Sequence, residues 1–443
     1  MAICSQTAGS DAATKLTVLM LWLLLAAFVV YPLARLLLMA FTADGSFTLA
    51  NLRPFIDSWY DRQAAVNSIL LGCSVGLAGT VLGFIFAYAV TRLSMPKWLK
   101  MAVSAVTLLP LISPPFTSSI ALTLSLGPNG ILLEFLGLGN FNFYGFWGTF
   151  ISETLTFFPV AFMTLSTILA RIDPNLEDAA YSLGASSFKV FRSVTLPLAA
   201  PGIANAFLLV FSCSLADFAT PQVLGGDSFP VLPTQAYLQI TGMYDFKGGS
   251  ALSFMLLIPA IAVYVLQRYW VGKKSYVTVS GKAGGRSSVK GPGLMLTSGI
   301  VGVVAFVSVF IMYLSASMVK IWGINNTLTL EHYEYVFTYG MKAIKDTLLI
   351  ACIGTPLGGL LAVLVGYATT RLKVRGSRTL ETVSLLNYTL PGTVVGIAYI
   401  IAFNDKPIVL TGTLYILVAA YVFRYSSAGI RNVIAALTQI DPS

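Results

Sequence analysis

The feature that most constrains this chain is a series of apolar runs, each about 20 residues long, the length at which a helix crosses a lipid bilayer. Because lipid offers the backbone no hydrogen-bond partner, each run is expected to form a helix that satisfies its own peptide groups. The predicted fold class is therefore an all-α polytopic membrane protein with about ten transmembrane helices. The runs fall at approximately 16–40, 64–91, 99–126, 145–170, 198–216, 250–270, 294–318, 343–370, 380–403 and 410–436.

The composition agrees with this class. Hydrophobic residues make up 56% of the chain and charged residues 10%, whereas soluble globular domains carry about a quarter charged residues. The net charge of +9 would suit a nucleic-acid partner, but most Lys and Arg residues stand in the segments between the runs. That distribution indicates membrane topology, so the expected partner is the lipid bilayer and not a nucleic acid.

The distribution of Lys and Arg predicts the orientation, because basic residues are enriched on the cytoplasmic side. The first run, 16–40, lacks a clear small-residue cleavage site, so we expect it to remain as a span. With the N-terminus in the cytoplasm, the larger basic set lies inside: Lys15, Arg92, Lys97, Lys100, Arg171, Lys189, Arg192, Arg268, Lys273, Lys274, Lys282, Arg286, Lys290, Arg371, Lys373, Arg375, Arg378 and Arg431. The smaller set lies outside: Arg53, Arg62, Lys247, Lys320, Lys342, Lys345 and Lys406.

The segment from Arg171 to Ile203 lies between two apolar runs, on the predicted inner side. It carries the residue types that begin and end short helices. Acidic residues in a first turn also favour a helix there, because they complement its dipole. The expected features are an N-cap at Asp173, Pro174 at the first helical position, a helix over 176–183 ended by Gly184, a second cap at Ser186 or Ser187, a second helix over 188–191, and Pro197 opening the next run.

The order Glu-x-Ala-Ala, Gly and Leu-Pro in this segment resembles the EAA loop of ABC importer permeases of the binding-protein-dependent, MetI-like family. The residues that carry the resemblance are Glu177, Ala179, Ala180, Gly184, Leu196 and Pro197. It implies that residues 173–190 dock on a separate ATP-binding subunit, present in two copies. Glu177 would meet donor groups of that subunit, the two alanines would allow close approach, and Gly184 would permit the turn. The alternative is an amphipathic helix lying on the membrane surface.

Sequence motifs recur in the two halves of the chain. Residues 87–93 match 366–372, Leu-Pro at 109–110 matches 390–391, and Ile-Asp-Pro at 172–174 matches 440–442. Duplicated bundles are common in transporters, so two tandem MetI-like bundles are expected. The repeat would place a second coupling Glu after residue 443, so we expect a truncated second bundle and twelve spans in a complete version. The expected parts are 1–60, the first permease domain 61–270, a cytoplasmic linker 271–293, a span with its outer loop 294–340, and a second domain 341–443.

Outer and linker segments sharpen the resemblance. Residues 215–235 and 268–282 are similar to ferric-iron-type permeases that hold both halves in one chain. The resemblance implies a bacterial inner-membrane subunit that takes its substrate from a periplasmic binding protein and releases it into the cytoplasm by alternating access. Ferric iron is the first expectation. Related permeases carry 2-aminoethylphosphonate, thiamine, sulfate or polyamines, and these substrates stay open.

Two charged residues within the runs are candidates for function, because charge in lipid is costly. Glu153 and Arg424 could line the pathway or pair between helices. An intramembrane enzyme or an ion-coupled carrier are the remaining alternatives. The chain has no HExxH motif, and its single histidine, His332, stands between runs. We therefore expect no catalytic residue, no metal site and no cofactor, with ATP hydrolysis in the partner subunit.

Overall fold

The computed structural model describes residues 12–43, 45–93, 95–113, 115–127, 137, 142–271, 314–322, 324–372 and 376–440. Its helices form two compact units. Unit 1 comprises Met1–Asp61, Gln235–Ile261 and Glu334–Ser443, and unit 2 comprises Arg62–Thr234 and Ala262–Tyr333. Four helices cross from one unit to the other along the chain: α4 (Trp59–Arg92), α12 (Leu232–Thr241), α13 (Phe246–Val265) and α15 (Glu331–Tyr339).

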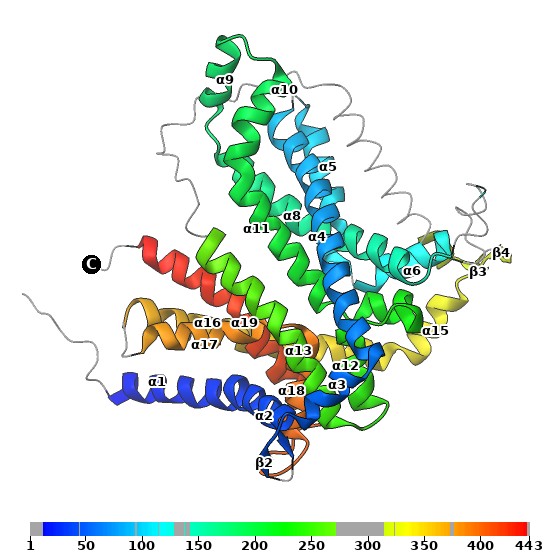
Figure 1. The fold of residues 1–443 in the computed structure, drawn as a ribbon, viewed down its shortest axis with the longest axis vertical. Coiled ribbons are helices and arrows are strands. Elements are labelled where there is room, and N and C mark those ends of the chain that lie inside the picture. Colours follow the sequence, from blue (N-terminus) through cyan, green and yellow to red (C-terminus); the bar gives the residue numbers. More distant parts are fainter. Residues whose placement is uncertain are drawn as a thin grey trace, which may run out of the picture. The chain divides into compact units, whose positions relative to one another are not determined.

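Unit 2 is built around the long helices α4, α8 (Phe146–Arg171) and α11 (Leu196–Ala216). Their facing sides form an apolar core that includes Val75, Phe158 and Val210. The short helices α9 and α10 lie beyond the ends of α8 and α11 (Figure 1). The other elements are α5 (Lys97–Ile112), α6 (Pro115–Leu126), α9 (Pro174–Ser182), α10 (Ser187–Val190), η3 (Phe191–Thr195), η4 (Pro221–Gly225), η5 (Gly226–Ser228), η6 (Leu266–Val271), β3 (Val319–Ile321) and β4 (Asn325–Leu328).

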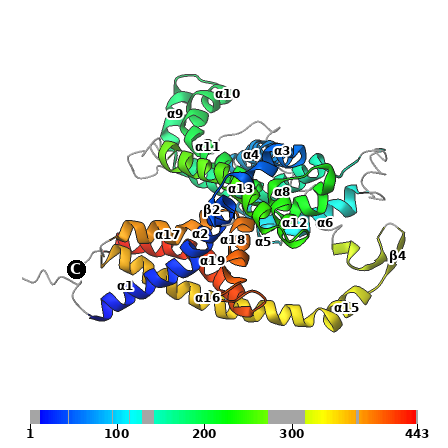
Figure 2. The same cartoon turned by 60° about the horizontal axis from the view of Figure 1, so that its bottom comes forward.

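Unit 1 contains the first helix of the chain and the last ones. Helices α16 (Met341–Thr370) and α19 (Leu414–Gln439) pack along each other, and α17 (Ser377–Thr389) lies beside them (Figure 2). Their core includes Leu361, Val365 and Phe423 and also Leu25 of α1. The remaining elements are α1 (Ala12–Leu25), η1 (Ala26–Val30), α2 (Tyr31–Phe41), β1 (Thr42–Ala43), β2 (Ser46–Phe47), η2 (Ala50–Leu52), α3 (Arg53–Asp57) and α18 (Gly392–Phe403).

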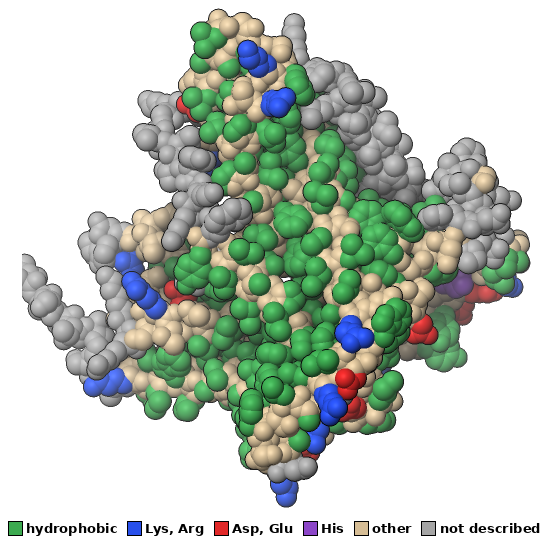
Figure 3. All heavy atoms as spheres, viewed as in Figure 1, with side chains coloured by type: hydrophobic (Ala, Val, Ile, Leu, Met, Phe, Trp, Pro, Cys, Tyr) green, Lys and Arg blue, Asp and Glu red, His purple; other side chains and the backbone are tan. Residues whose placement is uncertain are grey.

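The surface of the long helices is apolar. Leu19, Leu23 and Leu77 are all more than half exposed, and hydrophobic side chains are spread over the visible face, among few charged ones (Figure 3). A soluble monomer rarely exposes an apolar patch of more than a few hundred Å². In a bilayer such a surface faces lipid, which confirms the predicted class of helical membrane protein.

Six helical segments of the described chain are long and apolar enough to span a membrane: 14–41, 59–92, 146–171, 187–216, 246–265 and 341–370. Two predicted spans, 99–126 and 380–403, are each divided into two helices. The axes meet at 101° for α5 with α6 and at 106° for α17 with α18. A proline stands at each break, Pro115 at the start of α6 and Pro391 directly before α18. Proline favours a break there, because it cannot donate a helical hydrogen bond and disfavours helical backbone in the residue before it. Counting each bent pair as one span gives eight.

Two other predicted runs have different outcomes. Helix α19 forms where the run 410–436 was expected, but it is not among the six helical segments that are long and apolar enough to span a membrane. One of its faces carries polar side chains, and Ser427 donates a hydrogen bond to the Ser384 carbonyl of α17. Most of the run 294–318 and of the linker 271–293 lies outside the described residues.

The internal repeat has a counterpart in the three-dimensional contacts. Arg92 donates to the Ile172 carbonyl at 3.3 Å, and Arg371 donates to the Ile440 carbonyl at 2.9 Å. These residues are equivalent in the two halves, at separations of 279 and 268 positions. The arginine at the end of each matching sequence segment therefore makes the same kind of contact, with the residue that follows α8 in one half and α19 in the other.

Candidate functional site

The first helix of the predicted docking segment forms as its sequence indicates. Asp173 has an extended backbone, and its Oδ1 accepts a hydrogen bond from the Asn175 backbone N–H at 3.0 Å. Pro174 follows at the first helical position, where a missing N–H costs nothing. Helix α9 thus has a fixed starting point directly after α8.

Gly184 ends this helix in the left-handed region, with φ +81°. The Gly184 N–H donates to the Tyr181 carbonyl at 2.9 Å, and the Ala185 N–H donates to the Ala180 carbonyl at 3.1 Å. This pair of bonds is the Schellman arrangement, which a glycine adopts without steric cost. Among the described residues, nothing beyond the two chain neighbours lies within 4 Å of the place where a Cβ would stand, so the requirement for glycine here is conformational.

The second predicted short helix is not separate. Ser186 caps α10 through the Lys189 N–H, at 3.4 Å. The helix then continues through the π-helical turn η3 into α11, so that 187–216 is one helical segment. Leu196 and Pro197 lie exposed in the first turn of α11. A displacement of α10 would therefore act directly on a membrane helix.

Glu177 points into unit 2. Its side chain is 3% exposed, its Oε1 lies 3.2 Å from Arg92 Nε, and it accepts a hydrogen bond from Thr195 Oγ1 at 2.8 Å. Within the chain the carboxylate thus has its own partners, and its expected contact with donors on a partner subunit stays a prediction. Tertiary packing brings the C-terminal end of α4 beneath α9, where a basic side chain can neutralise the buried acid.

Aromatic rings support the same junction. The Phe191 ring of η3 meets the Tyr88 ring edge-on at 5.6 Å between centroids, and it contacts Phe84 at 6.0 Å. Both partners belong to α4, one and two turns before Arg92. The junction therefore combines a buried ion pair with an apolar contact, and it connects the α9–α10 segment to two membrane helices.

The segment exposes large apolar side chains. Leu183 is 88% exposed and Phe188 71% exposed, although both are large hydrophobic side chains. Ala179 is exposed beside them, and Ala180 is half-buried. This exposed set, Ala179, Leu183 and Phe188, is called the tip surface below. Exposed aromatic and branched apolar side chains next to small residues are typical of helix-docking surfaces.

The two charged residues within the spans both make contacts between helices. Glu153 of α8 is fully buried and accepts a hydrogen bond from Ser214 Oγ of α11. Arg424 of α19 donates to the carbonyls of Asn387 and Leu390, at 3.0 and 3.2 Å. These carbonyls lie at the C-terminal end of α17, where a helix has unsatisfied acceptors. Arg424 thus stabilises the bend between α17 and α18.

Sequence reasoning did not single out Arg92, Thr195, Leu183 or Phe188 as site residues. Arg92 could have been found, because the repeat of residues 87–93 at 366–372 contains this arginine in both copies. The other three carried no such signal. Within the described residues, no group of three or more His, Cys, Asp or Glu side chains is placed to hold a metal ion.

The long apolar helices, with the capped short helix α9 beyond their ends, are those of a helical membrane protein, and the comparisons identify it as a permease. The family model of binding-protein-dependent transport system inner membrane components matches residues 79–275, which include α9 and α10. The chain is 36% identical over 442 residues to the putative ferric transport system permease protein FbpB 1 of Haemophilus influenzae. The chain belongs to this family of ABC importer permeases.

The aligned lengths define how far the likeness extends. The alignment with the Haemophilus protein covers 95% of this chain and 68% of that protein. The ferric transport system permease protein FbpB of Actinobacillus pleuropneumoniae is 36% identical over 441 residues, which cover 95% of this chain and 63% of that protein. A crystal structure of a bacterial ABC transporter involved in the import of alginate matches 59% of this chain and 95% of its own, with a TM-score of 0.50 and 17% identity. The last likeness concerns the fold alone.

Proposed function

We propose that this chain is the membrane subunit of an ATP-driven importer of ferric iron in a bacterial inner membrane, with its N-terminus in the cytoplasm. The observation that carries the proposal is the identity of 36% to two ferric transport permeases, sustained over 95% of the chain. A periplasmic binding protein delivers the iron, and a separate subunit hydrolyses ATP.

The ATPase subunit docks on the tip surface. Leu183 and Phe188 supply the apolar contacts, and Ala179 lets the partner approach closely. Interface energy concentrates in a few apolar or aromatic anchors that fill pockets on the partner. In this proposal Glu177 does not contact the ATPase, because its carboxylate is buried against Arg92.

The geometry also supplies a route for movement. A push on α10 reaches α11 through the continuous helical segment 187–216. A push on α9 reaches the C-terminal end of α4 through the ion pair of Glu177 with Arg92. Packed helices move as rigid bodies and transmit displacement, whereas flexible loops absorb it. ATP binding would thus reposition two membrane helices of unit 2 together.

The test is iron uptake in proteoliposomes that hold the permease in its natural length with its ATPase, supplied with the iron-loaded binding protein. Leu183→Asp is expected to abolish uptake and to weaken ATPase binding at least tenfold, because it places a charge in an apolar contact. Met243→Asp changes another exposed apolar residue, which lies outside the tip surface, and should leave uptake unchanged.

The two parts of the proposal fail separately. Uptake of sulfate or a polyamine in place of iron would refute the substrate while leaving the docking intact. Normal ATPase binding by Leu183→Asp would refute the docking surface whatever the substrate.

A further inference from the structure

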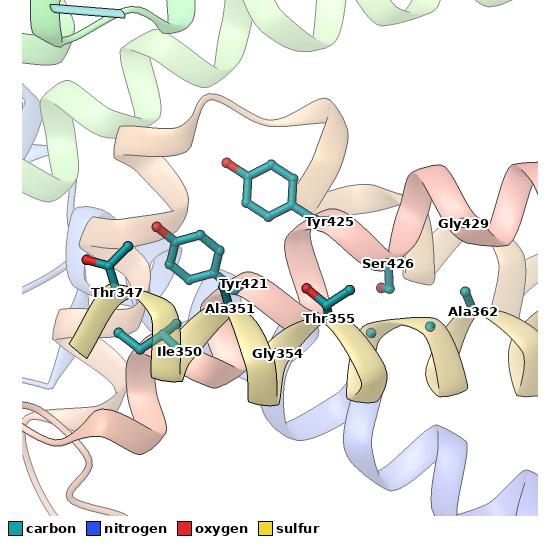
Figure 4. Close-up of a pocket in the computed structure, with 12 residues that line it drawn as sticks. Thr347, Ile350, Ala351, Gly354, Thr355, Ala362, Tyr421, Tyr425, Ser426 and Gly429 are labelled. Carbon is teal, nitrogen blue, oxygen red and sulfur yellow. The ribbon is translucent and has the colours of Figure 1, made fainter. Parts of the chain in front are cut away.

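A pocket of about 540 Å³ between α16 and α19 in unit 1 is lined by small, apolar and hydroxyl-bearing residues (Figure 4). None of the lining residues is acidic or basic. A multiply charged cation, such as the cargo proposed above, needs negatively charged ligands when it leaves water. Such ligands are found in unit 2 instead, where Glu153 and Asp217 are buried.

These two carboxylates come together where α8 meets the C-terminal end of α11. Glu153 of α8 accepts a hydrogen bond from Ser214 Oγ through its Oε2. Asp217 follows three positions after Ser214 and ends α11, and its N–H donates to the Ser214 carbonyl at 3.1 Å. Ser214 therefore brings the carboxylate of Glu153 close to that of Asp217, and the two interact electrostatically.

Each carboxylate has one oxygen to spare. Glu153 Oε2 accepts from Ser214, and Asp217 Oδ1 accepts from the Ala219 N–H at 3.0 Å. The other two oxygens, Glu153 Oε1 and Asp217 Oδ2, are buried and have no hydrogen-bond partner in the described part of the chain. A buried polar atom without a partner is costly, so these two oxygens call for a further group between the helices.

The cluster is negatively charged and has no basic partner. The charged side chain that acts on Glu153 is another acid, Asp217, and neither carboxylate belongs to an ion pair of the described residues. The end of α11 adds to the negative potential, because the last carbonyls of a helix are unsatisfied and carry the negative end of its dipole. Buried carboxylates need a counter-charge. Carboxylate and carbonyl oxygens are the ligands of hard cations, and helix C-terminal ends hold cations in transporters.

We propose that Glu153, Asp217 and the C-terminal end of α11 form a binding site for a hard, multiply charged cation. Glu153 Oε1 and Asp217 Oδ2 are its carboxylate ligands, and the buried Thr220 hydroxyl beside Asp217 adds a neutral oxygen. No third His, Cys, Asp or Glu side chain of the described residues is placed to join them, so carbonyl and water oxygens complete the coordination. A site with few protein ligands suits a cation that must leave again.

In the importer proposed above, this cation is the ferric cargo itself. The site lies where α8 begins and α11 ends, which is the predicted outer side, from which a binding protein would deliver iron. The assignment to the cargo rests on the proposed function, whereas the site itself does not.

The test is equilibrium dialysis of the detergent-purified permease, in the length in which the cell makes it, against Tb³⁺, a hard trivalent cation. Glu153→Gln and Asp217→Asn should each weaken Tb³⁺ binding by about tenfold or more, since even indirect partners of a metal cost that much. Both amides keep an oxygen for the existing hydrogen bond, so the fold is retained. Tb³⁺ should also raise the unfolding temperature of the wild type but not of the two variants, a difference that a purely structural role would not produce.

Asp61→Asn is the matched control, because Asp61 of α4 and Asp217 are equally buried, each with 9% of its surface exposed. It should bind Tb³⁺ as the wild type does. Unchanged Tb³⁺ affinity in Glu153→Gln and Asp217→Asn, or an equal loss in Asp61→Asn, would overturn the site.

The assignment to the cargo is tested separately. In proteoliposomes, Glu153→Gln should lower iron uptake by about tenfold or more and leave ATPase binding unchanged. Displacement of Tb³⁺ by equimolar Ca²⁺ would show a divalent site and overturn the assignment to ferric iron. Uptake of sulfate in place of iron would refute the proposed substrate, and Tb³⁺ binding that depends on Glu153 would still support the site.

Discussion

Arg92 Nε lies 3.2 Å from Glu177 Oε1, and the two side chains are 7% and 3% exposed. The pair joins the C-terminal end of the membrane-spanning helix α4 to α9, the short helix that contains Ala179 of the tip surface. A second contact reinforces it, because Arg92 also donates to the Ile172 carbonyl between α8 and α9. Glu177 therefore connects α9 to α4 within the permease.

Arg92→Met should strongly destabilise unit 2, because it leaves a buried carboxylate without a counter-charge. Removing one partner of a buried pair costs about 3–5 kcal/mol. The double variant Arg92→Met with Glu177→Gln removes both charges and should recover most of that loss, since Gln can still accept a hydrogen bond from Thr195. Thermal unfolding in detergent measures both effects. A double variant as unstable as the single one would show that the ion pair is not the cause.

Gly184→Val should loosen the end of α9. A β-branched residue in the left-handed region costs about 1–2 kcal/mol, and the open space around Gly184 excludes a steric clash as the cause. Gly184→Asn should be tolerated much better, because asparagine adopts this conformation more readily. Hydrogen exchange at the backbone amides of positions 184 and 185, which donate the two bonds that end α9, measures this loosening. Equal protection in the two variants would contradict a conformational role for the glycine.

Gly83→Ala should destabilise the α4–α8 contact, because its Cβ would stand 2.7 Å from the Ala161 Cβ. Overpacking of this kind costs about 1–3 kcal/mol. The swap Gly83→Ala with Ala161→Gly reproduces the arrangement of Ala362 with Gly429 in the other half and should regain part of the loss. Recovery stays partial because the Phe162 backbone N also lies 2.7 Å from the new Cβ. Thermal unfolding of the wild type, Gly83→Ala and the double variant measures these differences. A double variant less stable than Gly83→Ala would argue against an equivalent contact in the α4–α8 and α16–α19 pairs.

Arg424→Met should loosen the bend between α17 and α18. It removes two hydrogen bonds from a charged donor to the carbonyls of Asn387 and Leu390, each worth about 1.5–3 kcal/mol. The expected result is faster hydrogen exchange at the amides of Leu390 and Gly392. Arg378→Met changes an exposed arginine near the start of α17 and serves as the control. Unchanged exchange in Arg424→Met would show that the bend is held by other contacts.

Much of the local structure around α9 could be predicted from the sequence. Asp173, Pro174 and Gly184 act through hydrogen bonds to residues at most a few positions away, so their effect is encoded in the nearest stretch of chain. Hydropathy likewise identified most of the spans, because in lipid an apolar run of sufficient length has no alternative to a helix.

The direction of the Glu177 side chain could not be predicted in this way. Its partner Arg92 belongs to another helix, and only the packing of α4 against η3 brings the two together. The breaks in 99–126 and 380–403 were missed for a related reason. Hydropathy records that a stretch is apolar but not whether its two parts are collinear, and the bends of 101° and 106° depend on contacts such as those of Arg424.

The sequence by itself indicated that the chain is a helical membrane permease, that a capped short helix begins after Asp173, and that motifs recur along the chain. Those features depend on residue type, spacing and repetition along the chain. The tertiary structure alone decided that Glu177 is buried and that the side chains of Leu183 and Phe188 are exposed. The physical reason is that burial and pairing are set by the neighbours a side chain acquires from distant segments when the helices pack.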